Sequence, residues 1–319
     1  MTSASGRENR RVSRPAKALV SLLCSPLVLA GVGDAAEVSA RPGSVVRWSG
    51  DGSESCGRGM RTWSANADTC WFPIDLLEVE GEVAVFRIRA GRREAARIQV
   101  TDYPYPVQRI KLEDSSKVDL SPEDLVRVRR DQARVKSLWL LAGPARFRLP
   151  LAPPLEEMGP TGSFGSRRFF NGQPRSPHSG ADYPAVEGAT VFSVAPGTVV
   201  LASNLFFSGQ SVFVDHGDGL VSMYFHLSSM SVAEGEQLES RAVIGAVGET
   251  GRTTGPHLHF GLRWRGARVD PSLLLGPVAE IPALVESADP VNQADVLFTT
   301  NPRHNSEPET KLDAKEIPL

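Results

Sequence analysis

Hydrophobic and polar residues alternate in short runs along most of the chain. Residues 83–89 read Val-Ala-Val-Phe-Arg-Ile-Arg, and residues 97–100 repeat the two-residue period. Similar runs within residues 191–226 flank Ala-Pro-Gly at 195–197 and Gly-Asp-Gly at 217–219. Because successive side chains of a strand point to opposite faces, this period predicts short strands joined by tight turns. The chain is therefore expected to be mainly all-β.

The predicted strands fall into two regions. Residues 37–150 are expected to form a small β-sandwich-like domain with one helix, and residues 164–276 a second domain built on an antiparallel sheet with an open groove. The stretch 151–163, rich in proline and glycine, is interpreted as the linker between them. Residues 277–319 contain six prolines and show little periodicity, which predicts a disordered tail.

One helix is expected near the end of the first domain. Ser121 is a good N-cap, Pro122 suits the first helical position, and Glu123 and Asp124 place negative charge in the first turn. The hydrophobic spacing that follows predicts a helix from about Pro122 to Lys136, which would connect the two domains.

The first 36 residues have the pattern of a signal peptide. Five basic residues precede an apolar run at 18–32, and small residues follow at Gly33, Ala35 and Ala36. The run is too short and too interrupted to span a bilayer stably, so no membrane span is expected after cleavage. Leu-Leu before Cys24 does not suit a lipidation site. The protein is therefore expected to be exported to the periplasm or cell envelope of a bacterium.

Charge and cysteine content narrow the choice of partners. The chain has 35 basic and 37 acidic residues, and without residues 1–36 its net charge would be −5. Bulk charge therefore gives no indication of nucleic acid, nor of long-range attraction to an anionic polymer. Cys56 and Cys70 would be the two cysteines left after cleavage, and in an exported protein they are expected to form a disulfide worth about 3 kcal/mol.

The histidines are concentrated in one part of the sequence. Five of the six lie between His178 and His259. In a strand, His257 and His259 would present both rings to one face, and Asp182 follows His178 by four residues. Two nitrogen donors and one oxygen donor would leave a fourth tetrahedral position open, as in a catalytic zinc site. Two further histidines of the cluster would then remain for proton transfer.

Three short motifs carry a family resemblance: His178-x-x-x-Asp182, Tyr224-x-His226 and His257-x-His259. They resemble the signature of the M23 metallopeptidases, the lysostaphin- and LytM-like cell-wall endopeptidases, from about residue 164 to 275. The resemblance implies that His178, Asp182 and His259 bind one zinc ion per chain and that His226 and His257 are catalytic. It also implies peptidoglycan as the substrate, cut at a stem peptide or crosslink. A monomer is expected.

Tyr224 and two alternative functions complete the sequence-based hypotheses. Tyr224 would share a strand face with His226, which makes it a candidate contact with substrate. The main alternative is a non-catalytic LytM-like protein that binds cell wall or activates another hydrolase; such relatives lack one or more ligands, and none is missing here. A lipoyl-type carrier would need a lysine at its turn, and the chain has none between Lys136 and Lys311.

Overall fold

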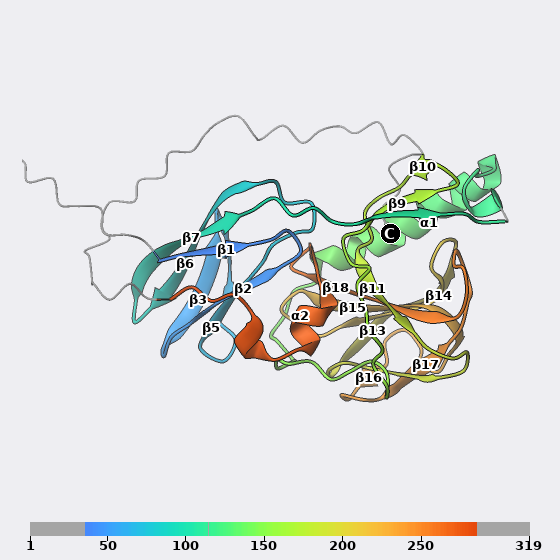
Figure 1. Ribbon diagram of the computed structural model, residues 1–319. Helices are drawn as coiled ribbons and strands as arrows, with labels where there is room; N and C mark the ends of the chain where they lie inside the picture. The colour runs from blue at the N-terminus through green and yellow to red at the C-terminus, as the bar shows by residue number, and fades with distance from the viewer. Residues whose placement is uncertain (1–35, 114, 286–319) are drawn as a thin grey trace, which may run out of the picture. The chain divides into compact units, whose positions relative to one another are not determined.

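The computed structural model describes residues 36–113 and 115–285 and is mainly β, which confirms the predicted fold class (Figure 1). Residues 1–35 of the predicted signal peptide lie outside the described residues. Its last residue, Ala36, begins the first strand. Within the described ranges, every helix is too short or too polar to cross a membrane.

The first region consists of a five-stranded sheet and a two-stranded sheet around one core. The larger sheet has the order β1-β7-β6-β3-β4 and the smaller one pairs β2 with β5. The bounds are β1 (Ala36–Ala40), β2 (Val45–Ser49), β3 (Ser53–Arg58), β4 (Arg61–Ser64), β5 (Thr69–Pro73), β6 (Gly81–Arg89) and β7 (Arg92–Val100). Both sheets contribute to one buried cluster that includes Val46, Phe72, Val85 and Ile98. This is the sandwich-like arrangement that the alternating runs predict.

Cys56 of β3 and Cys70 of β5 form a disulfide that joins the two sheets across this core. Their Cα atoms lie 5.5 Å apart, and neither residue is exposed to solvent. The cross-link therefore restricts the unfolded chain and is part of the hydrophobic core.

Replacing both cysteines with alanine (Cys56→Ala, Cys70→Ala) is expected to lower the free energy of unfolding of this region by about 3 kcal/mol, because the unfolded chain regains its loop entropy. Differential scanning calorimetry measures the change. The metal content should stay that of the unaltered protein, because both cysteines lie in the first region and the predicted ligands in the second. Loss of metal together with the disulfide would contradict this separation.

A third sheet and a helix link the two regions. β8 (Val107–Ile110) runs parallel to β9 (Arg167–Phe170), which pairs with β10 (Gln173–Pro174). The short 3-10 helices are η1 (Ser115–Lys117) and η2 (Leu138–Leu140). Helix α1 spans Pro122–Ser137, and the Ser121 side chain accepts a hydrogen bond from the Asp124 backbone N–H, as the N-cap sequence predicts.

Helix α1 packs against the second region. Val128 forms a buried cluster with Phe206 and Phe207, and the carboxylate of Asp131 accepts a hydrogen bond of 2.9 Å from the backbone N–H of Phe206. Together with the β8–β9 pairing, these contacts associate residues 107–140 with the second sheet.

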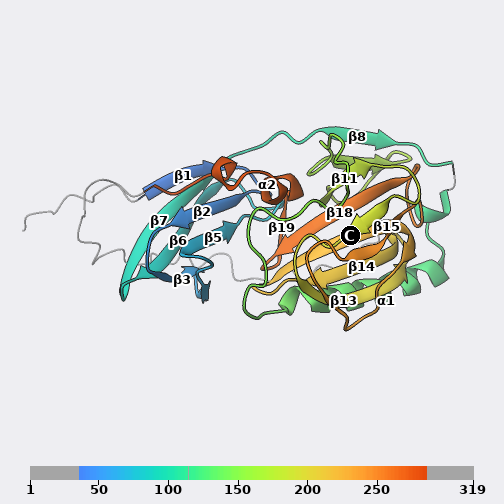
Figure 2. The ribbon, with the colours of Figure 1, turned by 90° about the horizontal axis from the view of Figure 1, so that it is seen from below.

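The second region is a nine-stranded sheet with a main order of β11-β18-β15-β14-β13-β16 (Figures 1 and 2). β12 and β17 pair with each other at its margin, and β19 pairs with β18. The bounds are β11 (Gly180–Pro184), β12 (Thr190–Phe192), β13 (Gly197–Leu205), β14 (Gly209–Asp215), β15 (Leu220–Met230), β16 (Gln237–Leu238), β17 (Val243–Val247), β18 (His257–Trp264) and β19 (Ala267–Val269), followed by α2 (Pro271–Leu275) and η3 (Val278–Glu280).

Two predictions about irregular segments differ from the structure. In the predicted linker, Leu151 and Leu155 are buried in the core of the second sheet. In the predicted disordered tail, Ile281 and Leu284 are buried, and the backbone N–H of Leu284 donates to the Arg47 carbonyl at 2.8 Å. The prediction of disorder is therefore wrong for residues 277–285, because isolated hydrophobic side chains there fill existing cores. Residues 286–319 lie outside the described residues.

Candidate metal centre and active site

Two neighbouring strands carry the centre of the site. β11 and β18 are antiparallel, and their register places Asp182 directly opposite His259. Along β18, Leu258 and Phe260 point into the hydrophobic core. The pleat therefore turns His257 and His259 together to the other face, where Asp182 can meet them.

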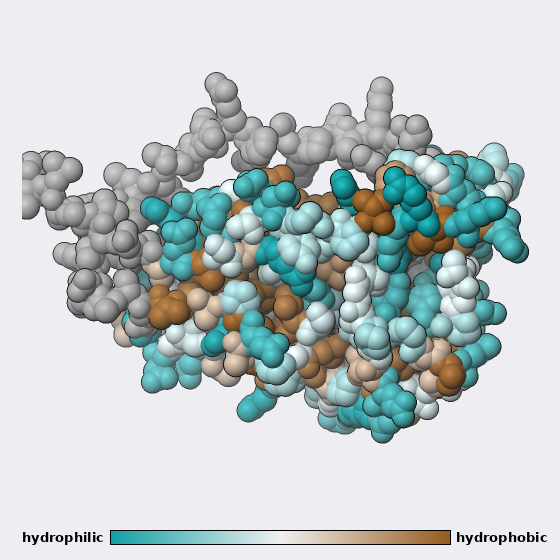
Figure 3. Space-filling view, viewed as in Figure 1, coloured by the Kyte–Doolittle hydropathy of each residue, from teal (hydrophilic) through white to brown (hydrophobic). Residues whose placement is uncertain are grey.

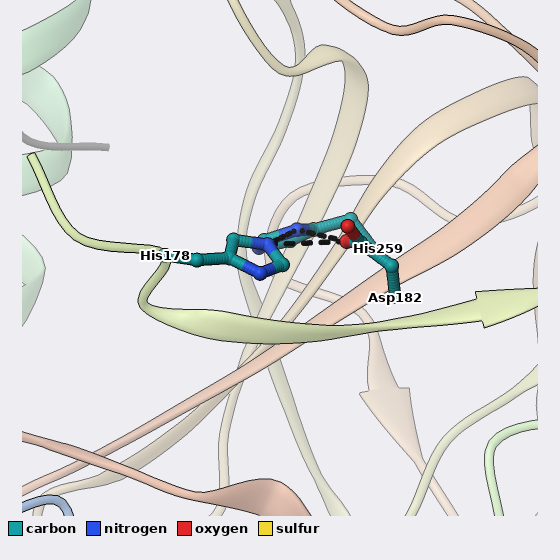
Figure 4. A group of neighbouring side chains, drawn as sticks. All are labelled: His178, Asp182 and His259. Atoms are coloured by element: carbon teal, nitrogen blue, oxygen red, sulfur yellow. Dashed lines mark hydrogen bonds and ion pairs between the residues drawn. The ribbon is translucent and has the colours of Figure 1, made fainter. Parts of the chain in front are cut away.

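Three side-chain atoms converge at this point (Figure 4). The Nε2 atom of His178 lies 2.8 Å from Nδ1 of His259 and 3.1 Å from Oδ1 of Asp182, and Nδ1 of His259 lies 2.9 Å from the same oxygen. Both histidines are buried. Two imidazole nitrogens and one carboxylate oxygen facing one another are the donor set that zinc prefers, so the residues fit such an ion.

Surrounding contacts orient the donors. His178 Nδ1 lies 2.9 Å from the Ser163 carbonyl, to which it can only donate, so the lone pair of its ring is on Nε2 and faces the centre. The hydroxyl of Ser163 accepts from the backbone N–H of Asp182 at 3.0 Å. The ring of Phe225 stacks on that of His259 with centroids 5.1 Å apart. A Cβ at Gly180 would lie 2.5 Å from His259 Nε2, so this position requires glycine.

The charge state of the three residues also suits a cation. Burial lowers the pKa of His178 to about 4 and also lowers the pKa of His259, so both rings are neutral at pH 7. Burial alone would raise the pKa of the Asp182 carboxyl, but its close contacts with the ring nitrogens of His178 and His259 hold that pKa well below its usual range. Arg168 binds the other oxygen, Oδ2, at 2.6 Å and leaves Oδ1 facing the centre.

His226 and His257 lie beside this group in matching orientations. Nδ1 of His226 lies 2.7 Å from the Thr250 carbonyl, and Nδ1 of His257 lies 2.8 Å from the Gly255 carbonyl. Each carbonyl accepts the ring proton, which leaves Nε2 of both rings unprotonated in the neutral form. The ring centroids are 4.9 Å apart, and His257 Nε2 lies 3.7 Å from Asp182 Oδ1. Burial, with repulsion from the neighbouring histidines, lowers the pKa of His226 to about 3.

Tyr224 does not face this site, and the predicted substrate contact is wrong. Its side chain is fully buried, and its hydroxyl accepts hydrogen bonds from the backbone N–H of Val194 at 3.0 Å and from the Ser222 hydroxyl at 3.1 Å. The prediction assumed regular alternation up to His226. His226 has a φ of 62°, and the pairing of β14 with β15 shifts register just beyond Tyr224, so the two side chains leave the strand on different faces.

The sequence model of peptidase family M23 matches residues 176–271, the segment that carries all five of these histidine and aspartate residues. This segment is an M23 peptidase domain. The M23 domain contains β11 to β19 and therefore both the strand that carries Asp182 and the strand that carries His259. The resemblance inferred from the three motifs is confirmed at the level of the family.

Two curated relatives each match about a third of the chain. The DD-carboxypeptidase/endopeptidase Mpg of Neisseria meningitidis serogroup B is 39% identical over 104 residues, which is 33% of this chain and 24% of Mpg. The peptidoglycan DD-endopeptidase ShyA of Vibrio cholerae is 38% identical over 95 residues, which is 30% of this chain and 22% of ShyA. The chain thus spans about a quarter of the length of these relatives.

A solved structure extends the likeness beyond the M23 domain. The crystal structure of an M23 peptidase from Pseudomonas aeruginosa is 29% identical and superposes with a TM-score of 0.57. The match covers 74% of this chain and 94% of that protein. The shared fold therefore includes more of the chain than the M23 domain alone.

Sequence reasoning missed two arginines of this site. Arg168 lies on β9, outside the three motifs, and contacts Asp182 because the third sheet folds back over β11. Arg252 belongs to the glycine-rich stretch before His257 and lines the same cavity as His178, His226 and His259. An arginine in a turn is usually solvated, so the sequence gave no signal of a role for Arg252. Arg168 reaches Asp182 through strand pairing that is distant in the sequence.

Proposed function

We propose that this chain is a zinc-dependent endopeptidase that hydrolyses peptide bonds in peptidoglycan. The observation that carries the proposal is the convergence of His178 Nε2, Asp182 Oδ1 and His259 Nδ1, with two further histidines beside them. These three residues would hold one zinc ion per chain. His226 and His257 would be the catalytic histidines.

Peptide hydrolysis needs an attacking water, a base for its proton and a donor for the leaving amine. Zinc in this donor set supplies a Lewis acid that lowers the pKa of an adjacent water to about 7. His226 and His257 divide the proton transfers between their Nε2 atoms. One accepts the proton of the attacking water, and the other, when protonated, donates to the developing oxyanion and then to the leaving nitrogen. The backbone carbonyls of Thr250 and Gly255 hold both rings in the tautomer that this requires.

The substrate and the location rest on the relatives and on the sequence. The named relatives are a DD-carboxypeptidase/endopeptidase and a peptidoglycan DD-endopeptidase. The amino-terminal signal pattern and the Cys56–Cys70 disulfide agree with export to the periplasm or cell envelope, where peptidoglycan lies. A non-catalytic wall-binding role is disfavoured, since every metal and catalytic position of the motif is filled.

Digestion of purified cell-wall sacculi by the zinc-loaded protein without residues 1–36 tests this function. We expect soluble muropeptides whose masses show added water at a peptide bond, with a new amine and a new carboxyl end. His259→Ala protein is the control and should release none. Intact sacculi after prolonged incubation with the zinc-loaded protein would refute the proposal and favour a wall-binding role.

A further inference from the structure

Three arginines surround the cavity beside the proposed zinc ligands. Arg168, Arg175 and Arg252 line it together with His178, His226 and His259. Arg168 lies on β9, Arg175 follows β10, and Arg252 precedes β18. In the space-filling view, hydrophilic side chains gather at the upper right over the segment of β9 and β10, with hydrophobic side chains between them (Figure 3). The cavity wall therefore carries a concentration of positive charge.

The Arg252 guanidinium is held firmly but has no carboxylate partner in the described part of the chain. It lies between two aromatic rings, with Cζ 4.4 Å from the ring centre of Phe170 and 4.3 Å from that of Phe207. Burial and the nearby charges of Arg175 and Arg168 lower its pKa to about 10, so it stays protonated at pH 7. Aromatic rings cover the two faces of the guanidinium plane, but the N–H groups around its edge can still donate hydrogen bonds.

The neighbouring groups leave this positive charge uncompensated. Arg168 is paired with Asp182, whose other oxygen faces the proposed metal. Arg175 donates to the carbonyls of Pro174 and Val118 and to the Gln173 side chain, none of which is an anion. Burying a positive charge without a counter-ion is unfavourable, so the guanidinium groups of Arg252 and Arg175 are suited to binding an anionic ligand.

The loop that carries Arg252 also positions His226. The Thr250 carbonyl accepts from His226 Nδ1, and the Thr250 hydroxyl donates to the Leu227 carbonyl at 2.7 Å. The backbone N–H of Arg252 donates to the Phe207 carbonyl at 2.7 Å. A Cβ at Gly251 would lie 2.5 Å from that same carbonyl oxygen, so the loop packs tightly against residues 207–209. The loop therefore holds Arg252 at a fixed position relative to His226, a proposed catalytic histidine.

We propose that Arg252, supported by Arg175, binds a carboxylate of the substrate next to the scissile bond. The inference rests on the proposed peptidase function and narrows its substrate class. It favours crosslinks in which the amine-side residue carries a free carboxylate on the carbon bonded to the scissile nitrogen. A bridge made of glycine residues carries no free carboxylate beside its internal peptide bonds. The planar guanidinium can donate two parallel hydrogen bonds to a carboxylate, which gives both affinity and orientation.

A matched pair of peptides tests this assignment. Both contain the same crosslink, with the carboxylate beside the scissile amide either free or converted to a primary amide. The zinc-loaded protein is expected to cleave the free acid with a kcat/KM about 10- to 100-fold higher. Zinc-free protein, studied by isothermal titration calorimetry, should bind the acid more tightly than the amide, which gives a readout independent of turnover.

The variants separate a binding role from a structural one. In Arg252→Met the preference for the acid over the amide should fall to within about threefold. Arg252→Lys keeps the charge but not the planar pair of donors, so its preference should lie between those of Arg252→Met and the unaltered protein. The matched control is Arg263→Met, another half-buried arginine stacked on an aromatic ring, that of Trp139, outside this cavity. It should keep the full preference. Zinc content and melting temperature confirm that each variant is folded.

Three outcomes would overturn the inference, and they differ in meaning. Equal cleavage of acid and amide by the unaltered protein would remove the carboxylate role and leave the proposed peptidase function intact. Absence of cleavage of both peptides and of sacculi would contradict the peptidase function on which it rests. An unchanged preference in folded Arg252→Met would assign carboxylate recognition to other residues.

Discussion

His259→Ala protein is expected to retain almost no zinc after dialysis, whereas the unaltered chain should hold one ion. The substitution removes one of three donors from a group whose atoms lie 2.8–3.1 Å apart. Two remaining ligands cannot supply the three protein donors that a catalytic zinc site uses. Hydrolysis of sacculi should disappear with the metal. Mass spectrometry of the native protein or elemental analysis measures the stoichiometry.

His257→Ala is the matched control, since it changes the other histidine of the same two-residue repeat. The ring of His257 lies outside the converging group, with Nε2 3.7 Å from Asp182 Oδ1, so zinc should stay bound. Equal zinc in the two variants would contradict the ligand assignment.

Replacing His226 or His257 with alanine is expected to reduce kcat by about 10²–10⁴-fold while zinc remains bound. Each ring is held at Nδ1 by a backbone carbonyl, of Thr250 or of Gly255, and lies beside the three proposed metal ligands. Because the two rings are proposed to act in one sequence of proton transfers, the double variant should lose less than the product of the single losses.

Steady-state kinetics on a defined crosslinked peptide, with zinc measured in the same samples, checks this expectation. The control is His216→Asn, because His216 is a buried histidine whose ring binds the Pro196 carbonyl and the Ser222 hydroxyl away from the site. It should affect stability more than kcat. Near-normal turnover by the metal-loaded double variant would refute the assignment of proton transfer to these histidines.

The elements of the fold were predictable where the pattern is local. Alternation along β6 and the cap at Ser121 identified a strand and a helix start that the structure contains. The parallel pairing of β8 with β9 was not predictable, because it joins residues about sixty positions apart and leaves no periodic signal. For the same reason the sequence did not show that helix α1 packs against Phe206 and Phe207 of the second region.

The site shows the same division between local and long-range information. The strand period alone suffices to put His257 and His259 on one face, because the pleat determines that relation. The same period misplaced Tyr224, since a non-glycine residue with positive φ interrupts it at His226. Arg168 reaches Asp182 through the register of a separate sheet, which no motif encodes.

The return of the chain to its first region has a consequence for the order in which the protein is completed during synthesis. Leu284 occupies a core otherwise made by residues 40–100, and residues 282–284 hydrogen-bond along β2 at Arg47. A ribosome releases the amino-terminal strands long before it reaches Leu284, so their hydrophobic core stays incomplete while the M23 domain is made. Closing this contact spans more than two hundred residues and belongs among the last steps of folding. The nascent first region therefore keeps an exposed apolar site until residue 284 has been made and has folded back onto it.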